Sequence, residues 1–212
     1  MNLHDLTVSD TGLEAGGHAK GVAVAIVCNN KDDSGQGRVK VKYPWYKNPT
    51  ESYWARVATP MAGANRGLYF IPEVDDEVLV AFDRGDVRFP YILGSLWSGK
   101  APAPENNANG KNDRGVIRSR KGHSLSFDDG ETGQVRLALN DGKTLTINDE
   151  GIRIDDGKGN SLHIDSKGGQ LTVEAATKLS LKAPAISIES SGTLEIKAGA
   201  TLTLQGAMIN IN

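Results

Sequence analysis

The second half of the chain repeats one three-residue unit nine times, in the order apolar, polar, apolar. Successive units start 7 to 10 residues apart, with a mean of 8, at residues 145, 152, 162, 171, 179, 186, 194, 202 and 209. Alternation with a period of two is typical of a half-buried strand, which has one apolar and one solvated face. Between the units lie Gly, Asn, Asp, Lys, Ser and Ala, which we interpret as corners between short strands.

Each of these predicted strands has only two or three apolar side chains to bury. The residues between the strands supply no second layer, so a regular array of this kind needs something outside itself to close its core. We therefore expect the chain to form an oligomer. Its shared core would be built from the apolar residues of the first eight units: Leu145, Ile147, Ile152, Ile154, Leu162, Ile164, Leu171, Val173, Leu179, Leu181, Ile186, Ile188, Leu194, Ile196, Leu202 and Leu204.

The first half has a different pattern, with five short segments of strand character between polar turns. They lie at residues 21–27, 37–43, 53–58, 77–82 and 91–96. All three Trp, all five Tyr and three of the four Phe lie before residue 100, so we expect this half to form a compact core around large side chains. Five short strands without a convincing helix predict a small β-barrel.

These patterns divide the chain into four parts. We expect an N-terminal arm at residues 1–20, a barrel at 21–97, a linker rich in Pro, Ala, Asn and Gly at 98–115, and the strand repeat at 116–212. Within the last part, we interpret residues 116–139 as irregular strands that precede the regular repeat.

Composition narrows the range of functions. The net charge is −2 and the isoelectric point about 6.1, so no strong electrostatic field points to nucleic acid or to an anionic membrane. A single cysteine, Cys28, excludes an intrachain disulfide and is consistent with assembly in a reducing cytoplasm. The N-terminus has no charged region followed by an apolar stretch, so we predict no secretory signal peptide.

Segments from both halves resemble a known family. They lie, in order, at residues 37–41, 53–58, 72–82, 85–86, 90–96 and 117–129. In that order they are similar to the central spike, or baseplate assembly protein V, of contractile phage tails. The valine-glycine-repeat spikes of type VI secretion and the spikes of extracellular contractile injection systems are related to it. The resemblance covers about residues 18–212.

The resemblance implies an all-β chain, in which an N-terminal OB-fold (oligonucleotide/oligosaccharide-binding) barrel precedes a trimeric, intertwined, triple-stranded β-helix. Three copies wound about one axis would turn their apolar pairs inward and satisfy their strand edges through neighbouring chains. The family implies a structural homotrimeric spike without enzymatic activity or cofactor. It would seat on a baseplate hub protein and puncture the target membrane on sheath contraction, as part of a virion tail or injection particle assembled in the cytoplasm.

Some members of this family carry additional domains that this sequence lacks, and we expect separate proteins to supply some of them. About 20 residues precede the barrel and 18 separate it from the repeat, so we expect the hub to be a separate chain and expect no lysozyme domain. The sequence has no His-x-His motif of a metal-binding apex, and it ends on strand register. We therefore expect a separate tip protein of the PAAR type to bind Met208, Ile209, Asn210, Ile211 and Asn212.

Aromatic and basic residues of the barrel allow two interpretations. Tyr43, Trp45 and Tyr46, with Lys42 and Lys47, resemble the stacking groove with which OB folds bind single-stranded nucleic acid. The same residues fit a barrel core and a contact with the trimer or the hub. Because the overall charge is close to neutral, we expect no nucleic-acid partner.

Three further alternatives concern enzymatic activity and metal binding. Adjacent acids at residues 32–33, 75–76, 128–129 and 155–156 could serve glycan hydrolysis, although we interpret each pair as part of a turn. We expect His163 to face outward and predict no metal ligands, while a metal on a threefold axis stays open. The main alternative function is a trimeric receptor-binding or glycan-degrading tail fibre.

Overall fold

The chain is all-β, as predicted. The computed structural model describes residues 13–14, 18–19, 21–46, 50–131 and 133–211. None of these residues is helical, so the described part has no helix of the length and apolarity that a membrane span requires. The chain forms two compact units, Met1–Lys111 and Asn112–Asn212.

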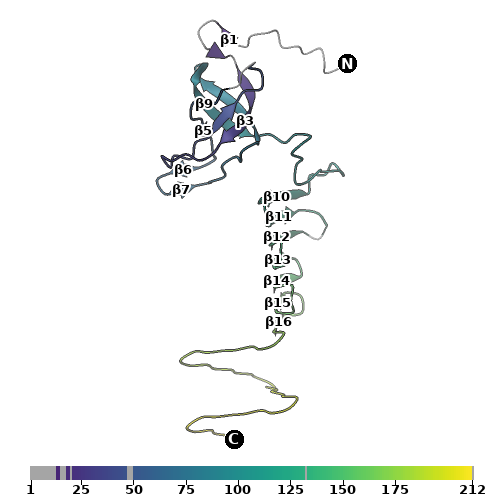
Figure 1. Ribbon diagram of the computed structural model, residues 1–212. Coiled ribbons are helices and arrows are strands. Elements are labelled where there is room, and N and C mark those ends of the chain that lie inside the picture. The colour runs from purple at the N-terminus through teal and green to yellow at the C-terminus, as the bar shows by residue number, and fades with distance from the viewer. Residues whose placement is uncertain (1–12, 15–17, 20, 47–49, 132, 212) are drawn as a thin grey trace. The chain divides into compact units, whose positions relative to one another are not determined.

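The first unit contains a closed five-stranded barrel (Figure 1). Strand β3 pairs antiparallel with β4 and β8, and β8 pairs antiparallel with β9. Strand β5 pairs in parallel with β9, and an antiparallel bridge between Val39 and Ala55 closes the ring. Closure leaves few free strand edges. The strands are β3 (Val22–Asn29), β4 (Lys40–Lys42), β5 (Arg56–Val57), β8 (Glu77–Asp83) and β9 (Asp86–Ser95).

Alternation along the barrel strands determines the core. In β8, Val78, Val80 and Phe82 are buried while the residues between them are not, so one face of the strand lies inside the barrel. The interior is filled mainly by valine and alanine. The buried core of the described part consists of Ala25, Val27, Val39, Val41, Tyr43, Ala55, Val78, Val80, Phe82 and Ile92.

The expected core of large side chains is wrong for most of the aromatic residues. Of the described aromatic residues, Tyr43 and Phe82 lie in the buried core. Five strands enclose a narrow interior, which has room for few rings. At least 48% of the surface is exposed in each of Trp45, Tyr53, Tyr69, Phe70, Phe89 and Trp97.

Two-residue strands supplement the barrel. Strand β1 (Leu13–Glu14) pairs with β2 (His18–Ala19), and β2 pairs with β9. Strands β6 (Ala62–Gly63) and β7 (Arg66–Gly67) form a separate hairpin. Part of the expected arm at residues 1–20 is therefore bound to the barrel, and the rest of it lies outside the described residues.

The second unit begins with a seven-stranded antiparallel meander (Figure 1). Each strand has five residues, and consecutive strands pair along their full length. Residues 116–139, where we expected irregular strands, are as regular as the part that follows them. The strands are β10 (Arg114–Arg118), β11 (Ser124–Asp128), β12 (Gln134–Ala138), β13 (Thr144–Asn148), β14 (Gly151–Asp155), β15 (Ser161–Asp165) and β16 (Gln170–Glu174).

From residue 175 to residue 211 the chain forms no strand. Five of the nine repeat units lie in this segment, so their predicted strands are not formed within one chain. A strand requires a hydrogen-bonded neighbour, and no described segment of the same chain supplies one here.

Candidate oligomerisation face

The register of the meander places apolar residues in two continuous columns on one face of the sheet. Directly opposed residues of neighbouring strands share a face, and so do residues two apart on one strand. We call the thirteen residues of the two columns the apolar face. One column consists of Ile117, Leu125, Leu137, Leu145, Ile154, Leu162 and Val173, and the other of Phe127, Val135, Ile147, Ile152, Ile164 and Leu171.

The apolar face is uncovered in a single chain. Nine of its thirteen residues are exposed and the other four are half-buried; Ile154 is 51% exposed and Leu171 66%. A hollow of about 430 Å³ lies over its central part and is lined by Leu145, Ile154 and Leu162, among others. Soluble monomers rarely expose continuous apolar patches of this extent. The face is therefore a candidate surface for association with other chains.

The opposite face of the sheet is polar. Its central column contains Arg136, Thr146, Arg153, His163 and Thr172 on five successive strands. His163 lies on this polar face, opposite to its apolar neighbours in β15, as its expected outward position requires. That this face points outward in an oligomer stays a prediction. One polar and one apolar face are typical of an antiparallel sheet that packs against another layer on one side.

Backbone hydrogen bonds along the meander are made within one chain. Six successive pairings connect β10 to β16, so the strands between these two have both edges occupied. Within the predicted repeat, the edges of β13, β14 and β15 are occupied by strands of the same chain and not by neighbouring chains as expected, because each strand folds back beside its predecessor. Other chains would meet this part of the molecule through side chains.

The predicted core residues fall into two groups of eight. The eight from Leu145 to Val173 all lie on the apolar face. The other eight lie beyond β16, and the role of all sixteen in a trimer core stays a prediction. Each of these is 54–68% exposed in the single chain: Leu179, Leu181, Ile186, Ile188, Leu194, Ile196, Leu202 and Leu204.

The predicted tip-binding residues are also exposed where the structure describes them. Met208 is 80% exposed, Ile209 50% and Ile211 84%. Asn210 is exposed as well, and Asn212 lies outside the described residues. Their binding of a tip protein stays a prediction.

Sequence reasoning missed five residues of the apolar face, although the signal was present. Leu125-Ser126-Phe127 and Val135-Arg136-Leu137 have the same apolar, polar, apolar form as the nine units. They start ten residues apart, and the second starts ten residues before Leu145. Because these two units are more widely spaced and are separated by more polar residues, we did not recognise them as part of the same repeat. The missed residues are Ile117, Leu125, Phe127, Val135 and Leu137.

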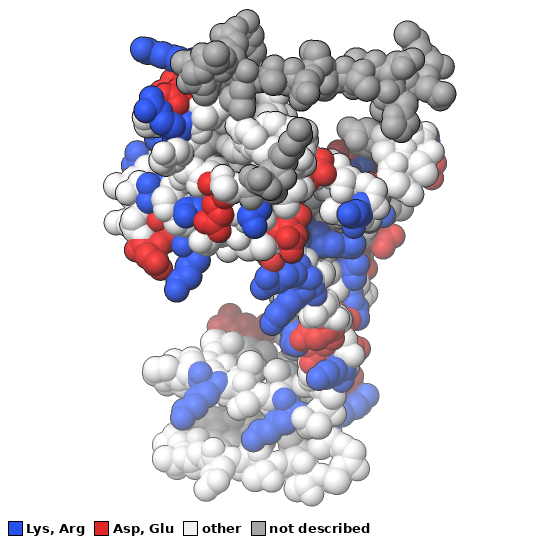
Figure 2. Space-filling view, turned by 45° about the horizontal axis from the view of Figure 1, so that its top comes forward, with Lys and Arg blue, Asp and Glu red and all other residues white. Residues whose placement is uncertain are grey.

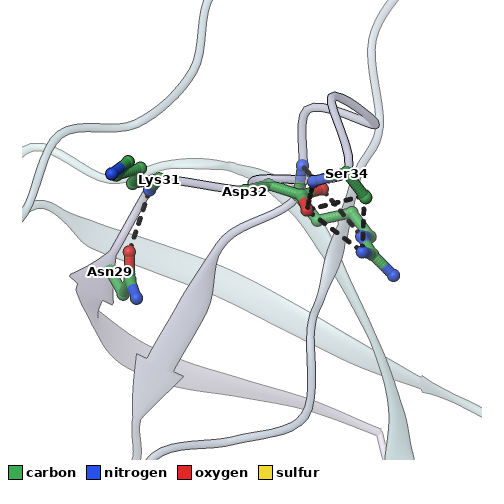
Figure 3. Close-up of polar contacts among 5 residues, drawn as sticks. Asn29, Lys31, Asp32 and Ser34 are labelled. Atoms are coloured by element: carbon green, nitrogen blue, oxygen red, sulfur yellow. Dashed lines mark hydrogen bonds and ion pairs between the residues drawn. The ribbon is translucent and has the colours of Figure 1, made fainter.

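In the barrel unit, Asp32 orders the loop between β3 and β4 (Figure 3). Its carboxylate accepts hydrogen bonds from Arg38 Nε at 2.8 Å and from the Ser34 hydroxyl at 2.7 Å. Lys31 N donates to Asn29 Oδ1 at 2.9 Å at the start of the same loop. The hydrogen bond from Arg38, together with those from Ser34, holds the pKa of Asp32 well below its usual range. The carboxylate therefore stays charged and fastens the loop.

The aromatic residues of the possible nucleic-acid groove divide between core and surface. Tyr43 is 5% exposed, and its ring centroid lies 4.9 Å from that of Trp45 and 5.8 Å from that of Phe82. Burial raises the pKa of the Tyr43 hydroxyl. Trp45 is 48% exposed, and Lys47 lies outside the described residues. The burial of Tyr43 supports the barrel-core interpretation.

The acid pairs at residues 32–33 and 75–76 lie in loops, as interpreted, whereas Asp128 and Asp155 are the last residues of β11 and β14 and only the second acid of each pair lies in the turn. Asp76 accepts a hydrogen bond from the backbone N of Glu73 at 2.8 Å, and Asp155 accepts one from that of Gly157 at 2.7 Å.

Figure 2 shows both signs of charge interspersed over the surface in view. Among the described residues, no group of three or more His, Cys, Asp and Glu is placed to hold a metal ion.

Comparison with known proteins gives matches in both units. Residues 23–97 match the type VI secretion system/phage-baseplate injector OB domain, and residues 115–168 match the phage baseplate V C-terminal trimerisation domain. The matched trimerisation domain supports a homotrimer. Its range contains all of the apolar face except Leu171 and Val173, so we identify this face as the candidate trimer interface.

Individual relatives include spike proteins of type VI secretion. The chain is 42% identical over 72 residues to spike protein VgrG3 of Vibrio cholerae, which covers 32% of this chain and 7% of that protein. It is 37% identical over 91 residues to spike protein VgrG1c of Pseudomonas aeruginosa, with 41% and 12% covered. It is 29% identical over 172 residues to the actin cross-linking toxin VgrG1 of Vibrio cholerae, with 74% and 16% covered. The chain thus spans a small part of these relatives.

Proposed function

Because the chain belongs to the family of baseplate spikes of phage tails and type VI secretion systems, we propose that it forms a homotrimeric needle at the axis of a contractile tail or injection machine. The barrel unit seats on a separate hub protein, and the second unit forms a shaft that pierces the target envelope when the sheath contracts. The action is mechanical, because contraction delivers force to a small area at the tip.

The observation that carries this proposal is the apolar face. A sheet with one apolar and one polar face is complete when its apolar side is covered, and three copies cover one another around a common axis. Full burial of a Leu or Ile side chain stabilises by about 1.5–3 kcal/mol, so covering a half-exposed one contributes roughly 1 kcal/mol. Thirteen such residues in each chain make association the main source of stability for this unit.

The regular strand ladder supports the transmission of load. A slip of one residue between neighbouring strands would turn a whole strand's apolar residues to the polar face. Six consecutive ladders oppose such slips within each chain, and the packing of two columns against the other copies opposes sliding between chains. The meander is therefore suited to act as a stiff element under axial force.

Exposed apolar residues support the proposed partners. In the barrel unit, Met61, Leu68 and Tyr69 flank the β6–β7 hairpin and are 52%, 48% and 78% exposed. They line a groove of about 510 Å³, which we propose as part of the hub contact. In the second unit, the exposure of Met208 and Ile211 supports binding of a separate tip protein.

Two measurements test the proposal. The purified chain should have a mass in solution of three times 22.6 kDa. In the cell that encodes the chain, replacing Ile154 and Ile164 by Asp should abolish delivery of the contractile particle's cargo into target cells. The two substitutions in each of three copies would bury six carboxylates at the axis of the trimer. The matched control, with Thr146 and Thr172 of the polar face replaced by Asp, should retain delivery. A stable monomer at micromolar concentration, or full delivery by the apolar-face variant, would overturn the proposal.

A further inference from the structure

The turns of the meander collect opposite charges at the two ends of its strands. Because consecutive strands run in opposite directions, the turns lie alternately at one end of the sheet and at the other. Exposed cations lie where β10 passes into β11, and we call them the basic end: Arg118, Arg120 and Lys121. Exposed acids lie in the first two turns at the opposite end, and we call them the acidic end: Asp129, Glu131, Asp149 and Glu150.

The basic end and the acidic end lie too far apart to pair inside one chain. Their nearest turns border the same strand, β11, whose five residues at about 3.4 Å each hold the two turns roughly 17 Å apart. Where opposite charges lie at the same end of the sheet, they do pair within the chain: Arg114 with Asp128, 3.7 Å apart, and Lys143 with Asp141. The basic end and the acidic end therefore do not neutralise each other in a single copy.

Local hydrogen bonds hold the turns at both ends of β11 in fixed positions. In the turn of the basic end, Ser119 N donates to His123 O at 2.8 Å, and Gly122 N donates to Ser119 O at 2.9 Å. In the turn that carries the acidic end, Gly130 N donates to Asp128 Oδ1 at 3.0 Å. Charged side chains on ordered turns lose less conformational freedom on pairing than those on loops that must first be ordered. Both turns are therefore suited to contact a partner.

We propose that the basic end of each copy forms ion pairs with the acidic end of the next copy around the axis of the trimer. Threefold rotation repeats one contact three times and brings one end of every sheet beside the opposite end of its neighbour. The partner is another copy because sheets that close around their apolar faces meet at their ends, and β11 of every copy has positive charge at one end and negative charge at the other. The inference rests on the proposed trimer and adds the contact that aligns its copies.

The main effect of these ion pairs is on the alignment of the copies, since exposed ion pairs add little to stability. The two columns of the apolar face carry mainly Leu, Ile and Val along their whole length, so they distinguish poorly between the two ends of the meander. The charged turns beside β11 mark one end. A copy that is inverted end to end would carry its acidic end away from the basic end of its neighbour. The charges therefore favour a trimer of three parallel copies.

Carbodiimide cross-linking of the full-length trimer provides the first test, because it joins a lysine amine to a carboxylate only where the two are in contact. Isotope-labelled and unlabelled copies are unfolded and refolded together. Mass spectrometry should then find Lys121 of a labelled chain joined to the acidic end of an unlabelled one. Lys121→Arg keeps the charge but removes the amine, so it should abolish this cross-link and leave the trimer intact. A trimer without cross-links between chains at Lys121 would overturn the inference and leave the proposed function standing, whereas a monomeric wild type would refute the proposed trimer.

Charge reversal with recovery provides the second test. Lys121→Glu places like charges together at each of the three junctions between copies. If each junction is weakened about fourfold, the dissociation constant of the trimer rises roughly 60-fold, and the concentration at which half of the chains are trimeric rises by about eightfold. Glu131→Lys should have the same effect. The variant with both substitutions restores opposite charges and should return to within about twofold of the wild type.

The matched control is Arg136→Glu, which makes the same reversal of charge on the polar face in the middle of β12. Its concentration of half-assembly should move by less than about threefold. The shift caused by Lys121→Glu should also shrink at about 1 M NaCl, where salt screens exposed charges beyond about 3 Å. An equal shift in the control, or no recovery in the double variant, would overturn the inference.

Discussion

Ile154 provides a direct measure of how far the apolar face stabilises the trimer. It lies in the middle of its column, opposite Leu145 on one side and Leu162 on the other, and it is 51% exposed in a single chain. Ile154→Ala removes three carbon atoms, each worth about 0.8 kcal/mol when fully buried. Since half of the side chain is already covered in one chain, about 1 kcal/mol per chain belongs to assembly.

Threefold symmetry multiplies this effect. Three substitutions in one trimer cost about 3 kcal/mol, which raises the dissociation constant of the trimer by roughly 100-fold. Because this constant has the dimension of concentration squared, the concentration at which half of the chains are trimeric should rise by about tenfold. A cavity that the surrounding side chains cannot fill would increase the shift.

The midpoint concentration, at which half of the chains are trimeric, can be measured by mass photometry of a dilution series. The series is run at a fixed urea concentration in which the wild-type trimer dissociates on dilution. Thr146→Ala is the matched control, since Thr146 lies on the polar face of the neighbouring strand. Its midpoint should move by less than about threefold, as for other surface substitutions. An unchanged midpoint for Ile154→Ala, or an equal shift for both variants, would refute the assignment of the apolar face as the interface.

Two further predictions concern local structure. A Cβ atom at Gly151, where φ is +151°, would lie 1.8 Å from the carbonyl oxygen of Ile164. Gly151→Ala should therefore lower the free energy of unfolding of the meander, measured in urea, by more than about 2 kcal/mol. An unchanged unfolding curve would contradict the backbone geometry at this position. The hydrogen bond from Arg38 lowers the pKa of Asp32 in the folded state. The charged Asp32 therefore stabilises the folded barrel above its unfolded-state pKa of about 3.9, and this stabilisation is lost as the pH falls through its folded-state pKa. Asp32→Asn should therefore lower the thermal unfolding midpoint of the barrel at pH 7, with a difference from wild type that shrinks below about pH 4, while Asp33→Asn should change little at either pH.

The orientation of the strand residues could be predicted from the sequence, and their pairing partners could not. Because side chains alternate along a strand, the order Leu162, His163, Ile164 determines which two residues share a face. The same order is compatible with a neighbouring strand from the same chain or from another chain. The distinction lies in the turns, where a positive φ at Gly169 accompanies the last reversal within the chain.

The barrel shows a second limit of the sequence. Its strands were found because segments such as residues 37–43 alternate clearly, but the content of its core was not. The large number of aromatic residues indicated a core of rings, whereas Val39 and Val41 point inward and Trp45 lies at the surface. The radius of a closed sheet depends on strand number and tilt, which composition does not reveal.

Because the seven strands of the meander have equal length and stack in regular register, the length of the meander depends on the number of its strands. Neighbouring strands are about 4.8 Å apart, so duplication or deletion of one hairpin would lengthen or shorten the molecule by about 10 Å. Each added hairpin would carry two inward positions on each of its two strands and return the chain in its original direction. In the proposed needle, the number of hairpins would therefore set the length of the second unit without any change to the barrel unit.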